Sequence, residues 1–104
     1  MSHRRAIWLS RSDGGNARKL AEFPSYTIGG VAFTPDGQRV LYSAIVGGRM
    51  QLFAISRTGG APVQITSDSA ANIMHPSVSP DGRFIAASRI PWRKELRRQP
   101  LPAD

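Results

Sequence analysis

The chain has 104 residues, of which 40% are apolar and 20% are charged, and its formal net charge is +7. A chain of this length can bury one modest core, and its balance of apolar and charged residues excludes both a disordered polyelectrolyte and a membrane protein. The absence of cysteine excludes disulfides, thiolate metal sites and a cysteine nucleophile.

The N-terminal residues 1–5 are expected to be disordered. The apolar run that follows Arg4 and Arg5 covers only residues 6–9, which is too short for the apolar region of a signal peptide. The sequence as written therefore predicts a cytoplasmic protein, and a periplasmic one only if the N-terminus has been truncated. No apolar run approaches the roughly 20 residues that a membrane span requires.

Residues 6–23 contain two predicted strands. Residues 6–11 and 17–23 are rich in apolar residues, and Gly14 and Gly15 lie between them, where glycine allows the positive φ of a hairpin turn. This segment is predicted to be half of a four-stranded unit.

Residues 29–66 contain four predicted strands, at residues 31–33, 39–43, 51–55 and 62–66. The sequence Thr-Pro-Asp-Gly joins the first two strands, and a Gly-Gly pair precedes the fourth. In such a turn proline presets φ, aspartate bonds to the local backbone, and glycine accepts positive φ. This segment is predicted to be one complete antiparallel unit.

Residues 75–90 repeat the first half of that unit. A second Pro-Asp-Gly turn lies between residues 75–79 and residues 84–90, and His75 is predicted to lie in the loop before the first of these strands. Residues 91–104 are predicted to form a basic C-terminal tail. The residues to which we assign a structural role in turns are Pro35, Asp36, Gly37, Gly59, Gly60, Pro80, Asp81 and Gly82.

An offset of 45 residues, the separation of Pro35 and Pro80, aligns the chain with itself. It also places Trp8 on Phe53. Strand-rich repeats of about 45 residues are typical of β-propeller blades. We therefore predict an all-β protein made of antiparallel four-stranded β-propeller blades, with one complete blade (residues 29–66) flanked by two half-blades.

The clearest copy of the repeat reads VAFTPDGQRVLYSAIVGGRMQLFAISRTGGAPVQIT. Its order of a strand, Thr-Pro-Asp-Gly, a second strand, an aromatic strand ending in a Gly-Gly turn, and a short strand closing in Ile-Thr resembles the TolB-type β-propeller repeat. The resemblance covers about residues 6–90 and implies a partial propeller. It implies no single function, because similar blades occur in TolB, in the propeller of prolyl-oligopeptidase-like peptidases, and fused to bacterial regulators and kinases. The copies differ at the first strand, where Gly30 corresponds to His75.

Two blades do not close a ring, since propellers contain about 4 to 8 blades. Identical chains could assemble, with three copies giving six blades. The chain could instead be part of a longer propeller, or a monomer whose exposed strand edges promote aggregation. The two half-blades are complementary, because each supplies the two strands that the other lacks.

The basic residues gather toward both ends of the chain, and Arg93, Lys94, Arg97 and Arg98 lie in the tail. This distribution is typical of a solvated terminus, so we do not predict nucleic-acid binding. A steep salt dependence of binding would be the signature of a nucleic-acid contact.

The sequence has no Gly-x-Ser-x-Gly motif, and its only histidines are His3 and His75. A catalytic triad needs a nucleophile, a base and an acid within bonding reach, so we predict neither enzymatic activity nor a catalytic residue. No group of histidines and carboxylates has the spacing of metal ligands, and we predict no metal and no cofactor.

Candidate binding residues lie in the loops and in the tail. The loops at residues 23–30 and 67–76 contain Tyr26 and His75, and the tail places Trp92 beside Arg93. We expect a protein partner or self-association. The leading hypothesis is a non-enzymatic, TolB-like protein-interaction scaffold. The alternative is the propeller portion of a prolyl-oligopeptidase-like serine peptidase without its hydrolase domain.

Overall fold

The computed structural model describes residues 5–23 and 28–91. In this part of the chain every regular element is a β-strand, and the strands form three antiparallel sheets, which confirms the prediction of an all-β, antiparallel fold. The strands are β1 (Arg5–Leu9), β2 (Arg18–Phe23), β3 (Ile28–Phe33), β4 (Arg39–Val46), β5 (Arg49–Ser56), β6 (Val63–Gln64), β7 (Ala71–Val78) and β8 (Ile85–Pro91). The described residues include no helix long and apolar enough to cross a membrane.

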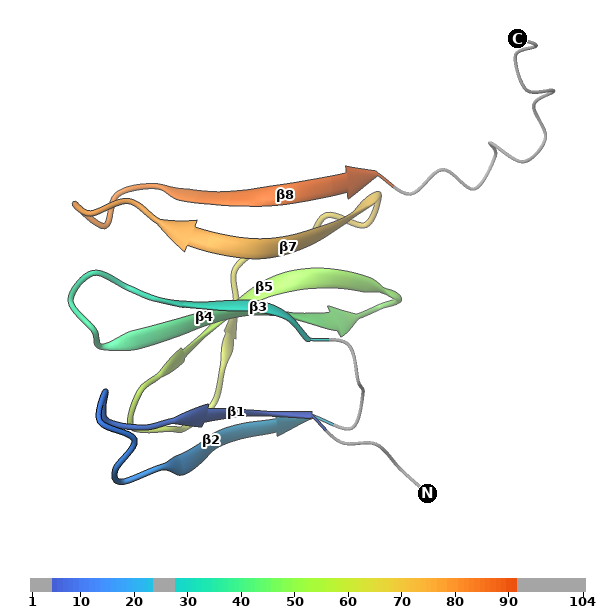
Figure 1. The fold of residues 1–104 in the computed structure, drawn as a ribbon. Helices are drawn as coiled ribbons and strands as arrows, with labels where there is room; N and C mark the ends of the chain where they lie inside the picture. Colours follow the sequence, from blue (N-terminus) through green and yellow to red (C-terminus); the bar gives the residue numbers. More distant parts are fainter. Residues whose placement is uncertain (1–4, 24–27, 92–104) are drawn as a thin grey trace, which may run out of the picture.

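The three sheets lie one on another, with the four-stranded sheet in the middle (Figure 1). Strands β1 and β2 form the first sheet, β3 to β6 the middle sheet in that order, and β7 and β8 the third sheet. The predicted boundary regions at residues 1–4 and 92–104 lie outside the described residues. Arg5 and Pro91, expected in a disordered terminus and a tail, are the end residues of β1 and β8.

The central residues of β4 and β5 in the middle sheet are buried on both faces, because their side chains alternate between the first and the third sheet. On one face Tyr42 lies in an apolar cluster with Ile7 and Leu20 of the first sheet. On the other face Leu52 packs with Ala71 and Ile73 of the third sheet. Tyr42 is only 1% exposed, and its ring stacks on Phe53 with the centroids 5.5 Å apart.

The two Pro-Asp-Gly turns make the same hydrogen bonds. In the first turn the Gly37 N–H donates to Thr34 O (2.8 Å), and the Asp36 carboxylate accepts from Thr34 Oγ1 (2.7 Å) and from the Gln38 N–H (3.0 Å). The same bonds in the second turn join Gly82 to Ser79 (2.8 Å), Ser79 Oγ to Asp81 (2.6 Å) and the Arg83 N–H to Asp81 (3.0 Å). Both aspartates therefore close their turns with their side chains.

The repeat offset also describes the strand register. Each of the following pairs recurs when both partners are advanced by 45 residues. In the first sheet, the β1–β2 pairs Trp8–Lys19 and Leu9–Arg18 become the β5–β6 pairs Phe53–Gln64 and Ala54–Val63. In the middle sheet, the β3–β4 pairs Ile28–Ala44, Ala32–Leu41 and Phe33–Val40 become the β7–β8 pairs Ile73–Arg89, Ser77–Ala86 and Val78–Ile85. The first sheet thus corresponds to the β5–β6 half of the middle sheet, and the third sheet to its β3–β4 half.

His75 lies inside a strand, which corrects the loop expected for it. β7 spans Ala71–Val78, and its pairing with β8 shifts between Met74 and Ser77. A bulge at this place accommodates Pro76, which has no N–H for the ladder. Residue 75 has φ of 57° and the corresponding Gly30 has φ of 88°, at a bulge in β3. The copies differ in residue type here but share a positive φ.

Alanine substitutions at Gly30 and Gly48 separate backbone strain from steric contact. Both glycines have positive φ, but a Cβ on Gly30 would lie 2.9 Å from His75 Cα, whereas a Cβ on Gly48 would meet nothing within 4 Å. We expect Gly48→Ala to lower the free energy of unfolding by about 1 kcal/mol and Gly30→Ala by about 2 to 4 kcal/mol. Urea unfolding followed by circular dichroism measures both values, and equal losses would contradict the close packing of β3 on β7.

Candidate functional site

The predicted binding residue His75 faces the strand of the neighbouring sheet. Its side chain is exposed, and its Nδ1 atom lies 3.1 Å from the position that a Cβ on Gly30 would take. Among the described residues, it forms no hydrogen bond with a serine hydroxyl or a carboxylate. Tyr26, Trp92 and Arg93, the other predicted binding residues, lie outside the described part of the chain.

The connection from the middle sheet to the third sheet is held by a buried glutamine. Gln51 is 2% exposed. Its Oε1 accepts hydrogen bonds from Thr66 Oγ1 (2.6 Å) and the Asp68 N–H (3.0 Å), and its Nε2 donates to Asp68 O (2.8 Å). Thr66 Oγ1 in turn accepts from the Leu52 N–H at 3.0 Å. Since the amide of Gln51 is bonded on both sides, its burial costs little.

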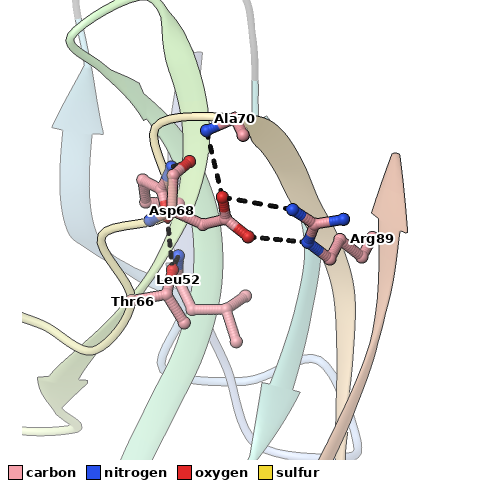
Figure 2. Close-up of polar contacts among 6 residues, drawn as sticks. Leu52, Thr66, Asp68, Ala70 and Arg89 are labelled. Atoms are coloured by element: carbon pink, nitrogen blue, oxygen red, sulfur yellow. Dashed lines mark hydrogen bonds and ion pairs between the residues drawn. The ribbon is translucent and has the colours of Figure 1, made fainter. Parts of the chain in front are cut away.

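Asp68 joins this connection to the last strand. Figure 2 shows its carboxylate between the Ala70 N–H, which donates at 3.0 Å, and the Arg89 guanidinium, whose Nε donates at 2.6 Å and whose second nitrogen lies at 3.4 Å. The hydrogen bond from Arg89, followed by that from Ala70, holds the pKa of Asp68 below its ordinary value. The same pair raises the pKa of Arg89. We call Gln51, Thr66, Asp68 and Arg89 the polar clamp.

A hollow of about 120 Å³ lies between the middle and third sheets, and Thr34, Arg39 and Gly82 line it beside five apolar residues. Its apolar lining comes from both sheets and consists of Leu41, Ala54, Ile65, Val78 and Ile85. Ile65 and Ile85 are among the exposed large apolar side chains. We call this feature the open hollow, because it is an apolar contact between two sheets that remains accessible to solvent.

A second hollow of about 280 Å³ has a basic lining near the ends of β1 and β2. Arg11, Arg18 and Arg57 line it together with Phe33. Arg11 is paired with Asp13 at 3.1 Å, and Arg18 donates to the backbone oxygen of Arg57. These contacts leave an exposed basic surface that favours acidic over basic partners.

Asp36 and Asp81 lie on the same side of the molecule, in the lining of one hollow of about 290 Å³. Hydrogen bonds from the Thr34 hydroxyl to Asp36 and from the Ser79 hydroxyl to Asp81 lower the pKa of both carboxyls. Their hydrogen-bonding capacity is directed into their own turns. In the described ranges, no group of three or more histidine, cysteine or acidic residues could hold a metal ion.

Gln51 and Arg89 are not among the residues predicted from the sequence. A signal for Gln51 was present, because it interrupts an apolar strand and occupies the position of Ala6 in the repeat; a polar residue in an apolar run commonly marks a buried hydrogen bond. Arg89 gave no comparable signal, because its partner Asp68 lies 21 residues earlier. No protein-family model and no curated protein matches the chain.

Acid should weaken the fold in part through Asp68. Its pKa is lower in the folded chain than the ordinary 3.8, so its contribution to stability is present above that value and is lost as the pH falls through the folded pKa. We expect Asp68→Asn to reduce the difference between unfolding midpoints in urea at about pH 7 and about pH 3. Part of the difference between the two midpoints should remain in this variant, because the pKa values of Asp36 and Asp81 are lowered in the folded chain too.

Arg89→Met is the matched variant for this measurement, since it removes the partner charge and keeps much of the side-chain length. It should reduce the pH dependence as Asp68→Asn does, and combining the two substitutions should add little. An unchanged pH dependence in both variants would contradict the role of the Asp68–Arg89 pair.

Proposed function

We propose that this chain is a two-blade unit of a TolB-type β-propeller and acts as a non-enzymatic scaffold for protein–protein interaction. The middle sheet is one blade, and the first and third sheets are two half-blades. A second protein chain supplies the strands that each half-blade lacks.

The conserved register offset is the observation that carries this proposal. Two two-stranded sheets each reproduce the register of one half of the four-stranded sheet, at the same 45-residue offset. A repeat that preserves its hydrogen-bond pairs, its turn bonds and its positive φ supports successive copies of one structural unit. The stacking of neighbouring units face to face further supports a blade-like arrangement.

The scaffold role is supported by the kind of surface that the half-blades present. Large apolar side chains are exposed on the outer sheets, among them Trp8 (60%) and Ile90 (48%), and Phe84 (66%) is exposed just before β8. Exposed apolar groups next to unpaired strand edges are features of a surface that is covered by another protein segment.

The solution mass of the purified chain tests the proposal. Eight strands amount to two four-stranded blades per chain, and rings of about 4 to 8 blades would require roughly two to four copies. We expect light scattering coupled to size exclusion to give one discrete oligomer in this range, with a β-type circular dichroism spectrum. A monomer, whether it unfolds cooperatively as a complete fold or lacks β structure, would contradict the proposal.

Salt should strengthen this association. Each chain carries a net charge of +7, so identical copies repel one another, and added ions screen the repulsion. We expect the dissociation constant of the oligomer to fall between about 0.05 and 0.5 M NaCl, where the Debye length shortens severalfold. Binding of the chain to a nucleic acid would weaken over the same range, and an oligomer that dissociates with salt would contradict assembly through apolar surfaces.

A further inference from the structure

We propose that β1 of a second copy of this chain pairs with the unpaired edge of β8, and that Trp8 of that copy covers the open hollow. This inference rests on the proposed function and adds to it the partner, the strands and the register. The contact is head to tail, because the first sheet of one copy meets the third sheet of another.

The unpaired edges are complementary in kind. β8 pairs only with β7, and β1 pairs only with β2. In the middle sheet the strands that correspond to β8 and β1 are β4 and β5, and these two pair with each other along their whole length. The two half-blades lack a ladder between the strands that correspond to β4 and β5. The β4–β5 ladder of the middle sheet therefore serves as a template for it.

Advancing β4 and setting back β5 by 45 residues gives the register of the missing ladder. Advancing β3 and β4 together reproduces the β7–β8 pairs named above, and setting back β5 and β6 together reproduces the β1–β2 pairs named there. We therefore apply the same offset to the template pairs Val40–Ile55, Leu41–Ala54, Tyr42–Phe53, Ser43–Leu52 and Ile45–Met50. The resulting pairs between β8 of one copy and β1 of the next are Ile85–Ser10, Ala86–Leu9, Ala87–Trp8, Ser88–Ile7 and Ile90–Arg5.

The open hollow lies where the template interface has an aromatic residue. Phe53 packs against the cluster that contains Leu20 and Val40, with Leu9 also packed on it. Advanced by 45 residues, Leu9, Leu20 and Val40 become Ala54, Ile65 and Ile85, and these three residues line the open hollow. The residue that corresponds to Phe53 is Trp8 of the neighbouring copy.

The sizes of the facing side chains support this assignment. At the interface of the first and middle sheets, Tyr42 of β4 stacks on Phe53 of β5. At the proposed interface, the corresponding residues are Ala87 of β8 and Trp8 of β1. The small side chain of Ala87 thus leaves room for the bulky indole of Trp8 on the facing strand.

The edge of β8 carries little that would prevent strand addition. Natural edge strands are protected by charged side chains, prolines or bulges. In β8 the one charged residue is Arg89, whose guanidinium is bonded to Asp68, and the one proline is Pro91 at the end of the strand. Residues 85–88 are all uncharged, and this run would pair with residues 7–10 of the second copy.

Cysteine cross-linking tests the register, since the native chain has no cysteine. We would mix a chain that carries Ile90→Cys with one that carries Arg5→Cys and oxidise mildly. Both residues are exposed and neither lines the open hollow. Directly paired residues have Cα atoms about 4.5 to 5.5 Å apart, within the range of a disulfide, so we expect a covalent dimer on a non-reducing gel.

Two controls define the register and the direction of pairing. Mixing Ala86→Cys with Arg5→Cys places the thiols on the same face but four residues, or about 13 Å, out of register, and should give little covalent dimer. Each single-cysteine chain oxidised alone reports pairing of β8 with β8 or of β1 with β1. Equal cross-linking in the shifted pair, or cross-linking of either chain alone, would overturn the inference.

Substitution of Trp8 tests the occupant of the open hollow. Trp8→Ala should raise the dissociation constant of the oligomer roughly tenfold or more, since buried tryptophans are frequent hot spots. The matched control is Phe33→Ala, which shortens an aromatic residue of similar exposure (52% against 60%) on β3, a strand outside the proposed contact, and should leave the constant nearly unchanged. Equal effects of the two substitutions would overturn the role of Trp8.

The mass of the same mixtures under reducing conditions separates this inference from the proposed function. A discrete oligomer that does not cross-link through residues 5 and 90 would overturn the β8–β1 contact and leave the scaffold proposal standing. The absence of any oligomer would contradict both.

Discussion

The structure depends on the burial of the middle sheet between two others. A sheet in water can hide an apolar face only against another layer, and β4 and β5 are apolar on both faces. Val40, Tyr42 and Ala44 are buried toward the first sheet, while Leu52 is buried toward the third. The polar clamp adds hydrogen bonds that link the middle sheet to the third sheet on one of these faces.

The outer sheets do not have this protection on both sides. Every residue of β8 is exposed, whereas β4, its counterpart in the repeat, has five consecutive buried residues. The difference arises from position in the stack, because β8 has a neighbouring strand, β7, on one edge only and has no sheet outside it. β8 carries apolar side chains of the kind found in a buried inner strand, although it lies in an outer sheet. This mismatch is the physical basis of the scaffold proposal.

The sequence was sufficient for the strands and turns, because their signals are local. Proline, aspartate and glycine occupy fixed turn positions, and alternating apolar residues mark the strands. The position predicted for His75 was wrong, because β7 continues past it and a bulge accommodates Pro76 within the strand. Gly30 lies close to His75, and Asp68 pairs with Arg89, because of the way the sheets stack. A short stretch of sequence carries no information about this stacking.

The two interfaces of the middle sheet are held by different means. Toward the first sheet, an aromatic cluster built on Phe23, Tyr42 and Phe53 supplies the packing. Toward the third sheet, the apolar cluster is smaller, and the polar clamp adds directional bonds around Gln51, for which the other interface has only Ala6 at the corresponding position.

Hydrogen bonds fix orientation without requiring a filled apolar contact. The clamp therefore holds β7 and β8 in position at the chain connection while the open hollow, formed partly by Ile65 and Ile85, remains uncovered. An interface held by polar bonds on one side and left open on the other can receive an additional strand without first being taken apart. Assembly would then complete the apolar contact rather than replace one.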